Sequence, residues 1–116
     1  MAQRALAGED FRIGVRELLD EFGLLLTDEQ RARAIAEEPP LTGDRRHDAY
    51  LGALAEHLAA RHSLERPEWC CRPERFLDRF WFLSDVPGFR ALAIAQSPAP
   101  FRRRGIFIAE GALQRC

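Results

Sequence analysis

The stretch DRRHDAYLGALAEHLAARH, at residues 44–62, carries the clearest structural signal in this chain. Its large apolar side chains recur at helical spacing: Tyr50, Leu51, Leu54 and Leu58. Alanine, which has the highest helix propensity of all residues, fills positions between them at Ala53, Ala55, Ala59 and Ala60. The stretch therefore predicts a helix from residue 44 to about residue 62.

Two more helices are predicted upstream. In residues 9–22 the apolar side chains form one stripe at helical spacing, made of Phe11, Val15, Leu18, Leu19 and Phe22. Gly23 is a natural stop for this helix. Thr27, followed three residues later by Gln30, is a capping-box pattern, so a second helix is predicted from Thr27 to the prolines at positions 39 and 40.

Prolines punctuate the second half of the chain and predict short helices there. Pro67 is expected to begin one turn, and Pro73 a helix that runs to about Phe82. The buried side chains of that helix are expected to be Phe76, Leu77, Phe80 and Trp81. Asp85 is expected to cap a helix over residues 86–96, with three side chains facing inward: Phe89, Leu92 and Ala93.

The last part of the chain repeats the cap-then-proline pattern. Ser97 and Pro98 lead into a turn that contains Arg102, Arg103 and Arg104, and Gly105 ends it. Residues 106–108 are expected to be extended, and residues 112–115 to form a final helical turn.

These elements predict an all-α fold class, a compact single-domain bundle of about five to six short helices with a short extended C-terminal segment. The chain has 116 residues, a usual size for one domain that buries a core without disulfide or metal support. We therefore expect one helical domain over residues 1–116, with a helical pair at residues 1–38 and a core at residues 39–116.

Composition narrows the compartment and the class of partner. The apolar runs are too short to span a bilayer, and residues 1–10 hold no secretory signal, so a cytoplasmic protein without membrane contact is expected. The odd set of Cys70, Cys71 and Cys116 fits a reducing compartment. All 17 cationic residues are arginine, as a G+C-rich genome would give, and the net charge of −1 does not favour nucleic acid.

Catalytic and metal-binding patterns are not found in the sequence. His47, His57 and His62 do not have the spacing of a metal site, so no metal and no cofactor are expected. Arg66 and Arg72 flank the paired cysteines and would lower a thiol pKa, although burial is the commoner fate of cysteine. We expect a protein that is not an enzyme and has no catalytic residues.

Two clusters are candidates for partner binding. Six of the aromatic residues lie between Trp69 and Phe89, and most are expected to be core. Phe80, Trp81 and Phe82 cannot all face one core from one helix, so at least one points to another element, a pocket or a partner. Arg102, Arg103 and Arg104 form the densest basic run, which fits either a solvated helix end or a contact with an acidic partner.

Several blocks of the sequence resemble a family of small actinobacterial proteins. The matching blocks are EPPLTGDRR at residues 38–46, LAEHLAARH at residues 54–62, PEW at residues 67–69, RFLD at residues 75–78, WF at residues 81–82 and SPAPFRRRGIFI at residues 97–108. The resemblance covers most of the chain after about Glu37, and its last block is the most specific. Members are often encoded beside a nucleotidyltransferase, and some relatives carry a helix-turn-helix segment in front.

That gene arrangement resembles a toxin–antitoxin pair. The resemblance implies a partner-binding antitoxin that neutralises the nucleotidyltransferase, with Trp81, Phe82, Arg102, Arg103 and Arg104 as the expected partner-binding residues. The first forty residues hold two helices rather than a three-helix DNA-binding module, which does not favour autorepression. Two alternatives stay open: a nucleic-acid-binding transcriptional regulator that uses the same arginines, and a small ligand-binding or enzymatic domain with an aromatic pocket.

Overall fold

Helices dominate the structure, as the sequence predicts, and the all-α fold class is confirmed. A computed structural model describes residues 8–82 and 90–108 of the chain. Its elements, in chain order, are α1 (Gly8–Gly23), α2 (Asp28–Ala36), α3 (Arg45–Arg61), the 3-10 turns η2 (Glu68–Cys71) and η3 (Pro73–Arg75), β1 (Trp81–Phe82), α4 (Arg90–Gln96), α5 (Ala99–Arg103) and β2 (Ile106–Phe107). Among the helices in this part of the chain, none combines the length and the apolar character that crossing a membrane requires.

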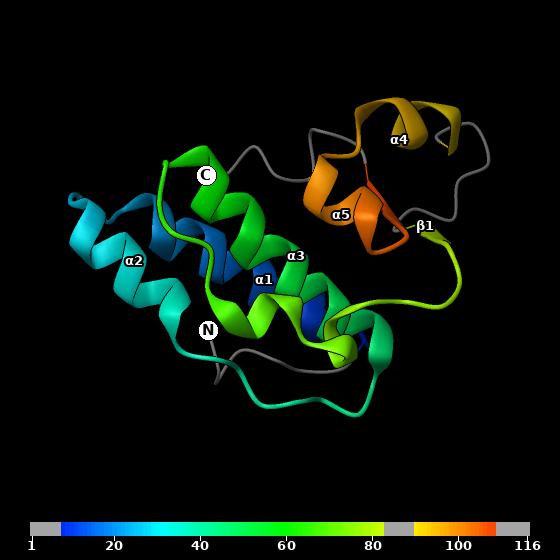
Figure 1. Cartoon of the computed structure of the whole chain (residues 1–116), viewed down its shortest axis with the longest axis horizontal. Helices are drawn as coiled ribbons and strands as arrows, with labels where there is room; N and C mark the ends of the chain where they lie inside the picture. Colours follow the sequence, from blue (N-terminus) through cyan, green and yellow to red (C-terminus); the bar gives the residue numbers. More distant parts are fainter. Residues whose placement is uncertain (1–7, 83–89, 109–116) are drawn as a thin grey trace.

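Helix α3 lies at the centre of the fold (Figure 1). The Asp44 carboxylate caps its first turn by accepting a hydrogen bond from the Arg46 N–H at 2.9 Å. Alanine and Gly52 let neighbouring elements approach closely, so α3 is buried on several sides rather than along one stripe. Helices α1 and α2 lie on one side of it, and η2, η3 and α5 contact it on the others.

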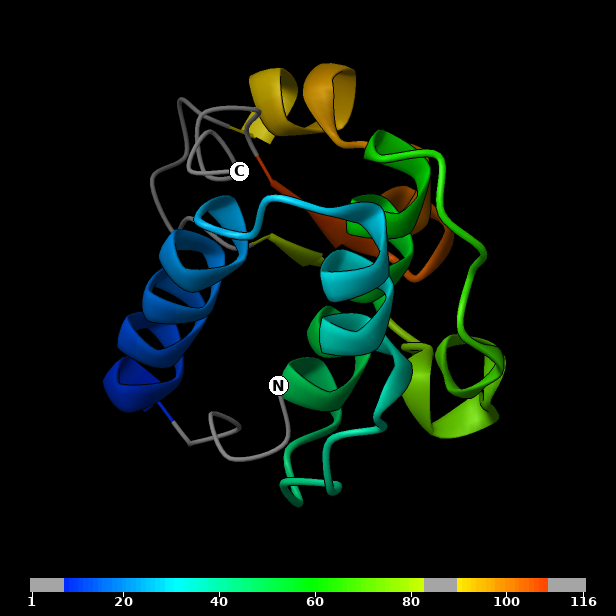
Figure 2. The ribbon, with the colours of Figure 1, turned by 90° about the vertical axis from the view of Figure 1, so that its left-hand side faces the viewer.

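The two helices predicted at the N-terminus, α1 and α2, are both present. The five apolar residues of the α1 stripe are all buried. Phe11 at the start of α1 packs on His47 near the start of α3, and Phe22 at its end packs on His62, so the two helices run side by side in the same direction. Helix α2 runs back in the opposite direction (Figure 2).

The predicted helix from Pro73 to about Phe82 is wrong. A 3-10 turn ends at Arg75, and the chain then extends to β1, which pairs in parallel with β2. Distant groups satisfy this backbone: the Arg45 side chain donates to the carbonyl oxygens of Pro73 and Phe76, and the Trp81 N–H donates to the Gly105 carbonyl at 2.7 Å. A helix would have used those same backbone groups internally.

The side chains expected to be buried by the helix from Pro73 to Phe82 have different exposures in the extended segment. Phe76, Leu77 and Trp81 are half-buried, and Phe80 is 77% exposed. The fully buried side chain of the segment is Arg75.

The remaining short elements agree with the sequence in part. Pro67 precedes the turn η2, Gly105 ends the α5 turn with a φ of +81°, and residues 106–107 form β2. Ser97 does not cap α5, because its hydroxyl instead bonds the Ala93 carbonyl and accepts from the Ile108 N–H. Ala93 is buried as expected. The expectations for Asp85, for Phe89 and Leu92 as inward-facing side chains, and for residues 112–115 lie outside the described backbone or side chains.

Candidate functional site

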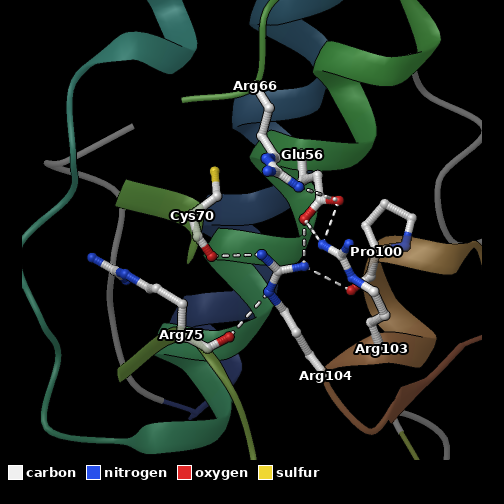
Figure 3. Close-up of polar contacts among 7 residues, drawn as sticks. All are labelled: Glu56, Arg66, Cys70, Arg75, Pro100, Arg103 and Arg104. Carbon is white, nitrogen blue, oxygen red and sulfur yellow. Dashed lines mark hydrogen bonds and ion pairs between the residues drawn. The ribbon is translucent and has the colours of Figure 1, made fainter. Parts of the chain in front are cut away.

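Three arginines converge on one carboxylate in the structure. We call Glu56, Arg66, Arg103 and Arg104 the arginine hub (Figure 3). Arg103 Nη2 lies 2.5 and 2.6 Å from the two Glu56 carboxylate oxygens, and Arg104 Nη1 lies 2.8 Å from Oε1. Arg66 Nη1 is more distant, at 3.7 Å from Oε2. The hub joins α5 and the segment before η2 to the middle of α3.

Arg104 is the interior member of the hub. Its side chain has no exposed surface. Besides Glu56, its guanidinium donates to the carbonyl oxygens of Arg75 at 3.0 Å, Cys70 at 2.6 Å and Pro100 at 2.8 Å. The planar fork of arginine suits several acceptors at once, and here it links η2, η3 and α5 to α3 (Figure 3).

Arg75 is a second buried arginine, close to the first. It donates to the backbone carbonyl oxygens of Asp48 at 3.2 Å and Pro39 at 2.7 Å, and to the Glu38 carboxylate at 3.0 Å. Its guanidinium carbon lies 4.9 Å from the centre of the Trp69 ring, a cation–π contact. This arginine fixes the connector between α2 and α3.

Burial of Arg104 corrects one expectation about the basic run. The sequence predicts three cations at a solvated helix end or a partner contact, but Arg104 is interior and meets no surface. Arg102 and Arg103 are exposed. Arg102 donates to the Ser97 carbonyl at 2.9 Å, which closes the end of α4 against α5. Two of the three predicted arginines therefore reach the surface, each with part of its guanidinium already bonded within the chain.

The three consecutive aromatic residues point to two faces, because the segment is extended rather than helical. Trp81 faces α3, where its ring centre lies 6.3 Å from that of Tyr50 and 5.5 Å from the Arg46 guanidinium. Phe80 and Phe82 both contact Phe107 of β2, with ring centres 5.4 and 5.0 Å apart. Trp81 and Phe82 are half-buried, so the most exposed aromatic is Phe80, which the sequence placed in the core.

Phe80 lies next to the α5 turn. A Cβ built on Gly105 would lie 3.5 Å from the Phe80 ring, and Arg103 precedes Gly105 by two residues. We call Phe80, Phe82, Arg102 and Arg103 the α5–β1 surface. It combines an exposed aromatic ring with two cationic side chains, the residue types that are enriched at protein–protein contacts.

The cysteines differ in environment. Cys70 is buried, and this burial raises the pKa of its thiol to about 12, which keeps it protonated near neutral pH. Arg104 and, less strongly, Arg75 lower the pKa of this thiol, but they do not offset the effect of burial. Cys71 is exposed, and Cys116 lies outside the described residues.

The three histidines do not come together with other metal-binding side chains. Within residues 8–82 and 90–108, no group of three histidine, cysteine or acidic side chains is placed to hold a metal ion. The histidines instead pack on phenylalanine rings of different elements.

Sequence reasoning missed the buried arginines, although one signal for Arg75 is present. Gly52 interrupts the alanine-rich α3, and a Cβ there would lie 2.9 Å from the Cβ of Arg75. A glycine in the middle of an otherwise strong helix indicates close approach of another chain segment. The sequence holds no similar signal that would distinguish the buried Arg104 from the exposed Arg102 and Arg103.

Comparison with protein-family models, curated proteins and solved structures finds no match to this chain.

Proposed function

We propose that this chain is a non-catalytic protein-binding module, the antitoxin component that neutralises a nucleotidyltransferase-type toxin. The class of partner comes from the resemblance of residues 38–108 to small proteins encoded beside nucleotidyltransferases. The α5–β1 surface supports a binding role, and the observation that carries it is Phe80, a large aromatic side chain that is 77% exposed. It lies next to Gly105, which closely follows the exposed Arg102 and Arg103 in the chain.

Charge gives the expected mode of contact. A nucleotidyltransferase site holds carboxylates that bind metal, and arginines pair with carboxylates through two parallel hydrogen bonds. Arg102 and Arg103 are the members of the predicted basic run that reach the surface. In this proposal they meet acidic side chains of the partner while Phe80 enters an apolar pocket, and Trp81 supports the surface from below rather than touching the partner.

Co-expression with a nucleotidyltransferase of the proposed partner class tests the proposal. Phe80→Ser and the pair Arg102→Glu and Arg103→Glu are expected to lose both co-purification and rescue of growth. Matched controls come from α2 and the turn before it, and Figure 1 shows α2 at the opposite end of the molecule from α5 and β1. They are Leu24→Ser, at a position 78% exposed, and Arg33→Glu, at an exposed position of α2. These controls are expected to bind and to rescue.

Two results would contradict the proposal. One is rescue that survives all three changes in the α5–β1 surface while the variants remain folded. The other is a wild-type chain that does not bind the nucleotidyltransferase but shifts DNA at low salt, with binding that weakens steeply as salt is added, which would favour the regulator instead.

A further inference from the structure

Every histidine of the chain lies on α3 or at its C-terminal cap, and each one packs against a phenylalanine of another element. His47 stacks on Phe11 of α1, with ring centres 4.0 Å apart and planes 5° from parallel. His62 packs on Phe22 at the other end of α1, at 5.3 Å. His57 meets Phe101 of α5 edge-on, at 6.0 Å. Histidines thus line the contacts of α3 with α1 and with α5.

Each of these rings also holds one buried nitrogen without a hydrogen-bond partner in the described part of the chain: Nδ1 of His47, Nε2 of His57 and Nε2 of His62. A neutral imidazole tolerates this, because only one of its nitrogens carries a hydrogen, and the other is an uncharged acceptor. A protonated imidazole carries a donor on both nitrogens and a positive charge, and burying these without acceptors is costly.

Charged neighbours further favour the neutral imidazole at two of the three histidines, His57 and His62. Burial lowers the pKa of His57, and Arg61 and His62 lower it further. Burial also lowers the pKa of His62, with Arg31 of α2 and Arg61 acting in the same direction against the carboxylate of Asp28. The carboxylate nearest to His57 in sequence, Glu56, is already held by the arginine hub.

His47 has a more balanced environment. Burial lowers its pKa and Arg46 adds to that effect, whereas Asp44 and Asp48 oppose it. Its Nδ1 lies 3.8 Å from the Asp44 carboxylate, so protonation would gain one partner there. His57 and His62 are therefore the positions where a proton is least compatible with the packed structure.

We propose that the three histidines form an acid-sensitive clasp, in which protonation of the imidazoles releases α1 and α5 from α3. His57 controls α5, because Phe101 is completely buried against α3 and directly precedes Arg102 and Arg103. His47 also lies under β1, with its ring centre 6.4 Å from that of Trp81. If the proposed function holds, acid therefore dismantles the α5–β1 surface and frees the partner.

The pH window follows from the direction of the shifts. An unfolded histidine takes up its proton near pH 6.5, and the folded pKa lies below that value at all three positions. Between the two values the unfolded chain binds more protons, so these histidines leave stability unaffected above about pH 6.5. Stability falls as the pH drops from there to the folded pKa and levels off below it. Each histidine lowers the ratio of folded to unfolded chain by at most about tenfold per pH unit.

Urea unfolding at about pH 7.5 and about pH 5.5 tests the clasp without any partner. We expect the folded-to-unfolded ratio of the wild-type chain to fall at least about tenfold, and that of His47→Gln, His57→Gln, His62→Gln combined to fall less than about twofold. His57→Gln alone is expected to remove a large share of the loss. Equal losses in the wild-type and triple variant would overturn the proposal, because carboxylates would then carry the acid sensitivity.

Proton NMR of the wild-type chain keeps the test decisive if the triple variant does not fold. We expect the resonances of His57 and His62 to titrate below pH 6.5 and in step with the loss of the near-ultraviolet circular dichroism of the packed aromatic rings. Titration of either residue at or above that pH in the folded chain contradicts the clasp. Capture of the nucleotidyltransferase at both pH values is a separate arm: no capture at about pH 7.5 refutes the proposed function and leaves the clasp to be judged on the unfolding data.

Discussion

Arg103 and Arg104 are neighbours that share the Glu56 carboxylate, yet their environments differ completely. The Arg103 side chain is 49% exposed, whereas that of Arg104 is fully buried with three backbone carbonyl partners. A surface ion pair contributes little to stability, because water screens it and long side chains lose entropy when they are ordered. Breaking a buried pair leaves desolvated acceptors, which is strongly destabilising.

We therefore expect Arg104→Met to lower the free energy of unfolding by about 3–5 kcal/mol and Arg103→Met to change it by less than about 1 kcal/mol. Arg104→Lys is expected to recover little, because a single ammonium cannot reach acceptors that the planar guanidinium spans. Urea denaturation of the purified chain measures all three. Similar losses of unfolding free energy for Arg103→Met and Arg104→Met would contradict the prediction that the buried arginine contributes more than the exposed one.

At the scale of single elements, α2 combines a complete N-terminal cap with a small buried face. It buries Ile35, while the capping box joins the Thr27 side chain to the Gln30 N–H at 3.2 Å and the Gln30 side chain to the Thr27 N–H at 3.4 Å. A short helix with little packing needs such local support, since nucleation is unfavourable in isolation. The neighbouring turn η2 adds one tie, from Trp69 Nε1 to the Ile35 carbonyl at 3.0 Å.

Thr27→Ala is expected to lower the free energy of unfolding by about 1 kcal/mol, because it removes the acceptor for an N–H at the start of α2. Thr27→Ser, which keeps the hydroxyl, is expected to stay within a few tenths of a kcal/mol of the wild type. Thermal unfolding followed by far-ultraviolet circular dichroism measures both. A Ser variant as unstable as the Ala variant would indicate that the methyl group, and not the cap, matters at this position.

The elements that sequence reasoning found are those whose causes are local. Spacing of apolar residues, the Asp44 and Thr27 caps and the stop at Gly23 lie within each helix or beside it, so α1, α2 and α3 could be predicted. Residues 73–82 could not, because their backbone groups are satisfied by Arg45 and by the α5–β2 turn, which are distant in sequence.

The same reason limited prediction of the site. Trp81, Phe82, Arg102 and Arg103 do come together in one region around β1, β2 and α5. Three arginines in a row look alike in sequence, and the structure separates them: Arg104 is the C-terminal cap of α5 and turns inward to carbonyl oxygens of other segments. The predicted helix places Phe80 in the core together with Trp81. In the extended chain, neighbouring side chains point to opposite faces, and Phe80 is exposed.

On the scale of the whole molecule, stability is expected to be greatest in α3. Most of its residues are buried, and every other major element contacts it or contacts a neighbour of it. Native-state hydrogen exchange is expected to show the slowest amides in α3 and much faster exchange in α2, where few apolar contacts protect the backbone. Exchange in α2 as slow as in α3 would indicate one cooperative unit without this hierarchy.

The position of Arg104 along the chain also has a consequence for biosynthesis. Its partners Arg75, Cys70 and Glu56 precede it by 29, 34 and 48 residues, and all are made earlier on the ribosome. Until α5 emerges, Glu56 has the more distant Arg66 as its hub partner, and the carbonyl groups of Arg75 and Cys70 lack the guanidinium of Arg104. A nascent chain that stops before Arg104 is therefore expected to remain a target for chaperones and proteases.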